Sequence, residues 1–172
     1  MGQFPMKITP PSGSVLRGNQ HLGAFVGSNP YFLYNRAAIS APYIGERARI
    51  NPRLKSMADA GVLIGLHSDS PVGPPKPLEM AWIAINRINR AGKVDGPAER
   101  VSVDQAMRMV TINAAIMLGM DDRVGSIVTG KFADFAVLDK DPYTVPKEQI
   151  KDIKVWGTVS GGRVFPASEI RQ

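Results

Sequence analysis

The chain has 172 residues, 44% of them hydrophobic and 21% charged, a composition typical of a folded globular protein and not of a disordered one. It contains no cysteine, which excludes disulfides, cysteine-ligated zinc or iron–sulfur sites and cysteine nucleophiles. The net charge is +6, and the only histidines are His21 and His67, so a metal site built mainly from histidines cannot be completed within this chain. No apolar run approaches the roughly 20 residues of a membrane-spanning helix, so we expect no contact with a membrane.

The positive charge does not by itself indicate a nucleic-acid partner. Basic residues are scattered as singles, and one local cluster is spaced like a helix face: Arg47, Arg49, Arg53 and Lys55. No aromatic residue is interleaved with this cluster for base stacking, so we predict a solvated helix surface and no nucleic-acid partner. The start of the sequence has neither the apolar core of a secretory signal nor the myristoylation pattern, so we expect a cytoplasmic protein.

The first third of the chain predicts two strands separated by a helix. Residues 1–20 read as an irregular lead-in interrupted by proline and glycine. The apolar run 22–26 predicts a buried strand, which continues into a loop over 27–42. A helix is expected over 44–60. The continuous apolar run 62–66 then predicts a strand covered on both faces, as in a parallel sheet.

The middle of the chain predicts two helices. After a Pro/Gly-rich loop at 70–77, apolar residues recur at helical spacing over 78–92. Ser102, followed three residues later by Gln105, is the signature of a capping box, and the helix that it starts is expected to end at Gly119. The order strand, helix, strand, helix, helix favours an α/β fold of repeated βα units.

The pattern changes after Gly125. Short β-like runs separated by glycine turns follow, at Ile127, 135–138, 155–159 and 164–165. The pair Gly161-Gly162 between the last two runs predicts a β-hairpin. The chain is therefore expected to be α/β for about 120 residues and to end in a small β module.

The motif that best indicates chemistry is His67-Ser68-Asp69-Ser70-Pro71, directly after the predicted strand 62–66. In parallel α/β sheets and barrels, active sites lie at the carboxyl ends of strands. On an extended backbone His67 and Asp69 would point to the same face, and a carboxylate there can ligate a metal or take a proton from water. The structural alternatives are an Asx turn made by Asp69 before Pro71 and a buried core histidine at His67.

A second motif superficially resembles a phosphate loop. Gly130-Lys131 is followed by Phe132, where that loop requires serine or threonine, so a tight turn feeding a strand is the better interpretation.

Other side chains carry weaker functional signals. Arg47, Arg87 and Arg90 are candidates for holding an anionic substrate group, although exposure or pairing with acidic residues is the commoner role of arginine. Ser68 and Ser70 lack the G-x-S-x-G context of a serine hydrolase.

Four stretches together resemble the carboxyl-terminal part of amidohydrolase-superfamily enzymes, specifically amidohydrolase family 3. They are "NPYFLYNRAAISAPYIGERARINPRLKSMADAG", "GVLIGLHSDSPVGPPKPLEMAWIAINR", "SVDQAMRMVTINAAIMLGMDDRVGSIVTGKFADFAVLDKDP" and "IKDIKVWGTVSGGRVF". The resemblance covers roughly residues 22–166, in order and with natural spacing. It implies the last two βα units of a metal-bearing (β/α)8 barrel and a trailing helix over 21–122, followed by part of a small β-sandwich over 123–172.

The resemblance also implies a reaction. Family members hydrolyse C–N bonds with a metal-activated water, and the aspartate at the end of their eighth barrel strand matches Asp69. That residue contacts the metal or its bound water and shuttles the proton to the leaving group. The resemblance therefore implies Asp69 as catalytic and metal-contacting residue, with His67 expected to bind substrate.

The family's other metal ligands precede the matched region: a His-x-His on the first strand, a carboxylated lysine or glutamate, and histidines of the fifth and sixth strands. His21 matches none of them. We therefore expect a carboxyl-terminal fragment of an amidohydrolase that is inactive alone and holds no metal stably. The complete enzyme is expected to use a divalent metal, zinc, and a small amide-type substrate. The competing hypothesis is a non-catalytic module that docks on a complementary partial barrel or self-associates.

Overall fold

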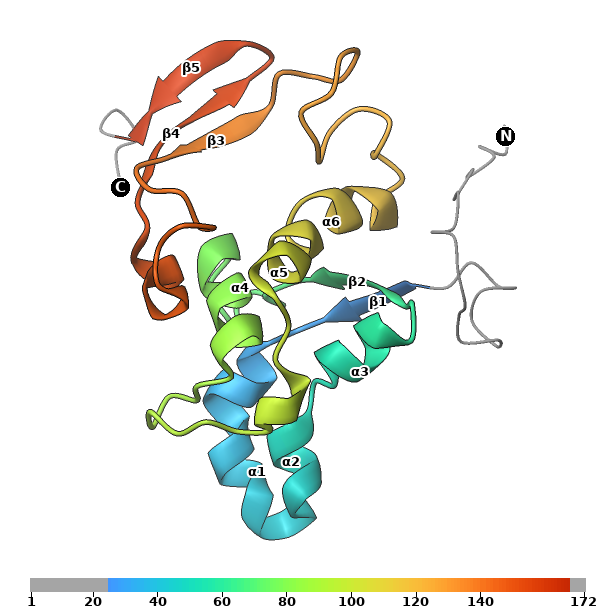
Figure 1. The fold of residues 1–172 in the computed structure, drawn as a ribbon, viewed down its shortest axis with the longest axis vertical. Coiled ribbons are helices and arrows are strands. Elements are labelled where there is room, and N and C mark those ends of the chain that lie inside the picture. The colour runs from blue at the N-terminus through green and yellow to red at the C-terminus, as the bar shows by residue number, and fades with distance from the viewer. Residues whose placement is uncertain (1–24, 168–172) are drawn as a thin grey trace.

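A computed structural model describes residues 25–167, which form a mixed α/β fold with two separate sheets (Figure 1). The first sheet is a parallel pair, β1 (Phe25–Ser28) and β2 (Leu63–Leu66). The second is antiparallel, in the order β3 (Phe135–Leu138), β4 (Val155–Ser160) and β5 (Arg163–Pro166). The two parallel strands do not close a barrel. Of the predicted barrel portion and β-sandwich portion, the structure therefore shows an α/β part and a small antiparallel sheet. The predicted lead-in, His21 and the first residues of the predicted strand 22–26 lie outside the described residues.

Short helices make up most of the remaining regular structure. They are η1 (Phe32–Arg36), α1 (Ala37–Ile44), α2 (Glu46–Ile50), α3 (Leu54–Asp59), α4 (Pro77–Asn86), η2 (Pro97–Glu99), α5 (Val103–Met109), α6 (Ile112–Met117) and η3 (Lys147–Asp152). Across residues 25–167, none of these helices combines the length and hydrophobicity needed to cross a bilayer.

The parallel pair is covered on both faces, as predicted for 62–66. Ile64 and Leu66 are buried in the main core. On the opposite face Gly65 lies beside Gly27 of β1, and Met117 of α6 packs over both glycines. A Cβ on Gly65 would overlap the Met117 sulfur, so the missing side chain lets α6 approach the sheet closely.

The prediction of a loop over 27–42 is wrong, because η1 and α1 occupy most of this segment. The Asn29 side chain accepts a hydrogen bond from the backbone N–H of Tyr31, and the N–H of Leu33 donates to the carbonyl of Pro30. Tyr31 and Leu33 are each 1% exposed. Burial of these side chains stabilises a helical segment that its aromatic and proline content did not predict.

Two predicted helices are each divided in two. The helix expected over 44–60 breaks between α2 and α3 because Asn51 precedes Pro52, and its ψ of 144° is extended. The steric clash with a following proline ring disfavours helical backbone at such a position. The helix that begins after Ser102 breaks at Thr111, where φ and ψ are −125° and −99°. Its predicted capping box is confirmed, since both hydrogen bonds between Ser102 and Gln105 are present.

Helix α4 is the centre of the core. Every residue from Met80 to Asn86 is buried, which is the pattern of a helix surrounded by other elements. The helix ends at Arg87 in the left-handed region, with φ of 55°, and not near Gly92 as its periodicity predicted. Neighbours from α5 and η3 pack against it.

The carboxyl-terminal sheet consists of β3 (Phe135–Leu138), β4 (Val155–Ser160) and β5 (Arg163–Pro166). The hairpin prediction is confirmed: Ser160 pairs with Arg163 across Gly161 and Gly162, whose φ values of 55° and 80° suit glycine. The prediction of a β-like run at Ile127 is wrong, since this residue is 89% exposed and belongs to no strand.

Candidate functional site

The segment His67–Ser70 lies at the carboxyl end of the parallel pair. The backbone N–H of His67 donates to the carbonyl of Ser28, at 3.0 Å, so the chains leaving β1 and β2 remain in contact just beyond the strands. This is the edge at which the sequence placed the candidate site.

The backbone at Asp69 differs from the extended conformation that was assumed. Its φ is 52°, and its carbonyl accepts a hydrogen bond from the N–H of Val72, at 2.7 Å. His67 and Asp69 therefore do not follow the predicted alternation that would place both on the same face, because that alternation requires extended backbone.

The two structural alternatives for this motif are not observed. His67 is exposed, and so it is not a core histidine. Asp69 is also exposed, and its carboxylate makes no hydrogen bond or ion pair with any residue between 25 and 167, so it forms no Asx turn there. The Asp69 carboxylate is thus exposed and without a partner among residues 25–167, while the Asp69 carbonyl holds the turn to Val72.

Asn29 fixes the start of the candidate loop. It is 5% exposed, and its Nδ2 donates to the carbonyl of Ser68 at 3.1 Å. Its Oδ1 accepts from the N–H of Tyr31 at 2.9 Å. Asn29 was not among the predicted site residues, although an Asn-Pro pair directly after a predicted strand is a turn signal that marks it.

Tyr31 supports the other end of the loop. A Cβ on Gly73 would overlap the Tyr31 ring, so the ring packs directly against the loop backbone. Burial raises the pKa of the Tyr31 hydroxyl, and the carboxylate of Glu79 adds to the increase. The phenol therefore stays neutral at physiological pH, and the residue has a packing role beneath the loop.

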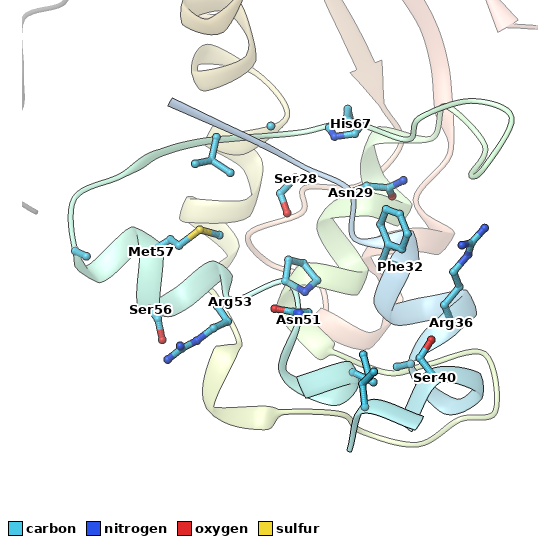
Figure 2. A pocket seen from close by; sticks show the side chains of 17 residues that line it. Ser28, Asn29, Phe32, Arg36, Ser40, Asn51, Arg53, Ser56, Met57 and His67 are labelled. Carbon is cyan, nitrogen blue, oxygen red and sulfur yellow. The ribbon is translucent and has the colours of Figure 1, made fainter. Parts of the chain in front are cut away.

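A groove of about 800 Å³ opens beside β1 (Figure 2). Its walls come from β1, η1, α1 and α3, with His67 at one edge. Asp69 is not among the residues that line it. The structure thus brings His67 to the groove and leaves Asp69 on the adjoining loop.

Arg87 is not an anion-binding residue. It is 1% exposed, and its guanidinium donates to the backbone carbonyls of Asp95, Pro52 and Arg49 at 2.8, 2.8 and 3.0 Å. Burial lowers its pKa to about 10, so it remains charged near neutral pH.

The other sequence candidates also lie away from the groove. Arg47 and Arg90 are exposed and do not line it. Lys131 donates from Nζ to the Ser126 hydroxyl at 2.7 Å, and the backbone of Gly130 has a φ of 93°. The interpretation of Gly130-Lys131 as a tight turn is therefore confirmed.

The described residues do not fit a complete metal centre. Between residues 25 and 167, no group of three or more histidine and acidic side chains is placed to hold a metal ion. Asp69 and His67 provide two such side chains next to β2, fewer than the three or four protein ligands of zinc sites.

Comparisons with known proteins agree on one family. A model of the amidohydrolase family, family 3, matches residues 19–166. The chain is 35% identical over 144 residues to an N-substituted formamide deformylase of Arthrobacter pascens, an alignment that covers 82% of this chain and 26% of that protein.

Solved structures show the same relationship in three dimensions. An uncharacterised metal-dependent hydrolase from Pyrococcus furiosus superposes with a TM-score of 0.59 and 27% identity, over 75% of this chain and 27% of that one. A second one, from Pyrococcus horikoshii, shows the same fold with a TM-score of 0.63 and 24% identity, over 78% and 29% of the two chains. The chain spans about a quarter of the length of the curated relatives it matches.

Proposed function

Because this chain belongs to amidohydrolase family 3, we propose that it forms the carboxyl-terminal part of a hydrolase that cleaves C–N bonds in small amide-like molecules. The observation that carries the proposal is the place of Asp69. Its carboxylate is exposed beyond the carboxyl end of a parallel strand and is free of partners among residues 25–167. Strand ends of this kind carry the catalytic groups of α/β barrels.

The step that we assign to this chain is proton transfer. Asp69 accepts a proton from the attacking water as the new C–O bond forms, and passes it to the leaving nitrogen as the C–N bond breaks. The exposed imidazole of His67 would hydrogen-bond a substrate oxygen at the edge of the groove. Asn29 and Tyr31 would hold the loop in position for this transfer.

The proposed enzyme also needs a divalent metal, for which zinc is our candidate. The two available side chains beside β2 do not complete its coordination, so the other ligands would come from residues outside 25–167 or from another chain. In this proposal Asp69 contributes one contact to the metal or to its water. The matching Pyrococcus furiosus protein is described as a metal-dependent hydrolase, which supports a metal in the proposed enzyme.

A second candidate function is a non-catalytic docking module. The observation that favours it is the exposed apolar surface of the small sheet, where Trp156, Val164 and Phe165 are 54%, 56% and 41% exposed. Such surfaces often mark contacts with another chain. In this alternative the chain would associate with itself or with a complementary partial barrel, and Asp69 would have no catalytic role.

The decisive experiment compares Asp69→Asn with the wild type, after the chain is joined to the remaining barrel segment of a relative and supplied with metal. We expect kcat to fall by about 100- to 10,000-fold, with a smaller change in KM, because asparagine keeps the shape but cannot accept the proton. His67→Ala should have a milder effect. The assay would use a panel of N-acyl and N-formyl compounds.

The matched control is Asp104→Asn, which changes an exposed carboxylate at the start of α5. It should leave kcat unchanged. Retention of most of kcat in Asp69→Asn, with loss in His67→Ala, would reverse the two roles.

A further inference from the structure

We propose that the groove beside β1 binds a small amphipathic carboxylate, with its charged end at Arg36 and its apolar body along the groove wall. Such a carboxylate would belong to the substrate class of the proposed hydrolase, and its role as a substrate rests on that proposed function. Binding itself can be measured on this chain without any reaction.

The groove carries positive charge that its lining does not neutralise. Arg36 and Arg53 line it, and none of its described lining residues is acidic. Arg53 lies 3.6 Å from the Glu99 carboxylate, and its side chain extends away from the groove centre (Figure 2). Arg36 forms no ion pair with residues 25–167, so it is the cation left for a ligand.

Arg36 is held at the rim of the groove. Its guanidinium lies over the ring of Phe32, 5.4 Å from the centroid, and both side chains stand on the same wall (Figure 2). Stacking on an aromatic ring leaves the in-plane N–H groups free to donate to a carboxylate. A single available arginine suits a monoanion better than a phosphate, which usually gathers more than one positive group.

A serine hydroxyl faces the interior of the groove. Ser28 is 6% exposed, and its oxygen is directed into the cavity (Figure 2). Its side chain makes no hydrogen bond with any other residue in the described part of the chain. A hydroxyl that faces the groove can accept or donate a hydrogen bond to a ligand atom or to water there.

Most of the remaining wall surface is apolar, although Asn29, Ser40, Asn51 and Ser56 also line the groove. The apolar side chains come from α1, α2, α3 and the residue after α3, and they are Ala37, Ile44, Ala48, Met57 and Ala60. Such a wall accommodates an alkyl chain or aryl ring, and methionine adapts its shape to the occupant. Charge at the rim and apolar surface inside together select an amphipathic anion.

The test is a titration of the purified 172-residue chain with each probe, in which NMR and calorimetry measure binding. The probes are 4-phenylbutanoate, its neutral analogue 4-phenylbutanamide and inorganic phosphate. We expect the acid to bind about tenfold or more tightly than the amide, the ratio that one charge-assisted hydrogen bond supplies. Phosphate should bind more weakly than the acid. Equal affinity for the acid and the amide, or tighter binding of phosphate, would overturn the proposal.

Variants identify the site. Arg36→Gln should abolish the preference for the acid and leave the affinity for the amide unchanged, whereas Arg36→Lys should keep part of the preference. Arg47→Gln is the matched control, because Arg47 is exposed and lies outside the lining, and it should bind like the wild type. Thermal unfolding shows whether each variant is folded. If Arg36→Gln is unfolded, Arg36→Lys replaces it as the variant that tests the proposal. An unchanged preference in the folded Arg36 variant would overturn the proposal.

This test separates the inference from the proposed function. If the acid binds through Arg36 but the completed protein hydrolyses none of the carboxylate-bearing amides, the binding site stands and the hydrolase proposal fails. If the completed protein hydrolyses neutral amides and shows no preference for the acid, the hydrolase proposal stands and the groove inference fails.

Discussion

At the scale of single residues, Asn29 holds the loop that carries Asp69. One amide group bridges the carbonyl of Ser68 and the N–H of Tyr31, two backbone groups from the chains that leave neighbouring strands. Asn29→Ala would leave both groups without this partner in a buried place. We expect the free energy of unfolding to fall by about 1–3 kcal/mol.

Urea denaturation would measure this change. Asn35→Ala serves as the control, because the Asn35 side chain makes no hydrogen bond within the described part of the chain. Equal effects of the two substitutions would show that Asn29 does not hold the loop.

Glu99 gives a residue-scale prediction about pH. Burial alone would raise the pKa of this carboxyl group, but hydrogen bonds from the N–H and hydroxyl of Ser56, helped by Arg53, lower it below its ordinary value of 4.5. A carboxylate whose pKa is lower in the folded state stabilises the fold above its unfolded pKa. This contribution is lost as the pH falls through the lowered folded pKa.

We therefore expect wild-type stability to decline more steeply below pH 4.5 than that of Glu99→Gln, which has no carboxylate to protonate. Chemical denaturation at a series of pH values would measure it, with the exposed Glu148→Gln as control. Parallel acid limbs for the wild type and Glu99→Gln would contradict the assignment.

Residue-scale prediction from sequence succeeded where the signal was local. The position of His67 and Asp69 just beyond a strand was predictable because the strand that they follow is apolar throughout. Asn29 was missed and Arg87 was given the wrong role because their partners lie 39 and up to 38 residues away in the chain. Only the tertiary fold brings those partners together.

At the scale of elements, the contact between the Tyr31 ring and the loop at Gly73 sets how closely the two chains pack. A Cβ on Gly73 would overlap several ring atoms, and a buried aromatic ring moves less readily than a flexible side chain. Gly73→Ala should therefore destabilise the protein by about 1–3 kcal/mol, the usual result of overpacking. Thermal or urea unfolding would measure the loss.

Gly27→Ala is a demanding control for this prediction. A Cβ there would meet its nearest neighbours at 3.4 Å, in ordinary van der Waals contact. It should be close to neutral. A Gly73→Ala protein as stable as Gly27→Ala would mean that the loop moves freely away from the ring.

The elements themselves were predictable to different degrees. The strand at 62–66, the Ser102 capping box and the Gly161-Gly162 hairpin were predictable because each depends on residues adjacent in the chain. The helix after Pro30 was not predictable, since it is stabilised by burial of Tyr31 and other side chains in a core assembled from distant segments. Periodicity likewise does not report the helix break at Thr111.

At the scale of the whole molecule, the exposed apolar side chains of the small sheet predict self-association of this chain. Val164 and Val159 are cross-strand partners on one face, and Val164 is 56% exposed. Sedimentation velocity should show species larger than the monomer that increase with protein concentration. Val164→Lys should shift the distribution toward monomer, because a charge on this face opposes its burial.

Gln149→Lys is the control, since Gln149 is an exposed residue of η3 outside the small sheet. A single sharp monomer at all concentrations for the wild type would contradict self-association and favour a self-sufficient domain.

The buried guanidinium of Arg87 has a consequence for which substitutions the chain tolerates. The break between α2 and α3 leaves the backbone carbonyls of Arg49 and Pro52 without helical hydrogen bonds. Arg87 donates to both of them, with two different nitrogens of its rigid, planar guanidinium. Lysine has the same charge but a single nitrogen, which cannot span acceptors at this spacing. Arginine is thus required here by the shape of the main chain around it and not by any acidic partner. A library of variants selected only for folding would keep arginine at 87 while exchanging the surface arginines freely.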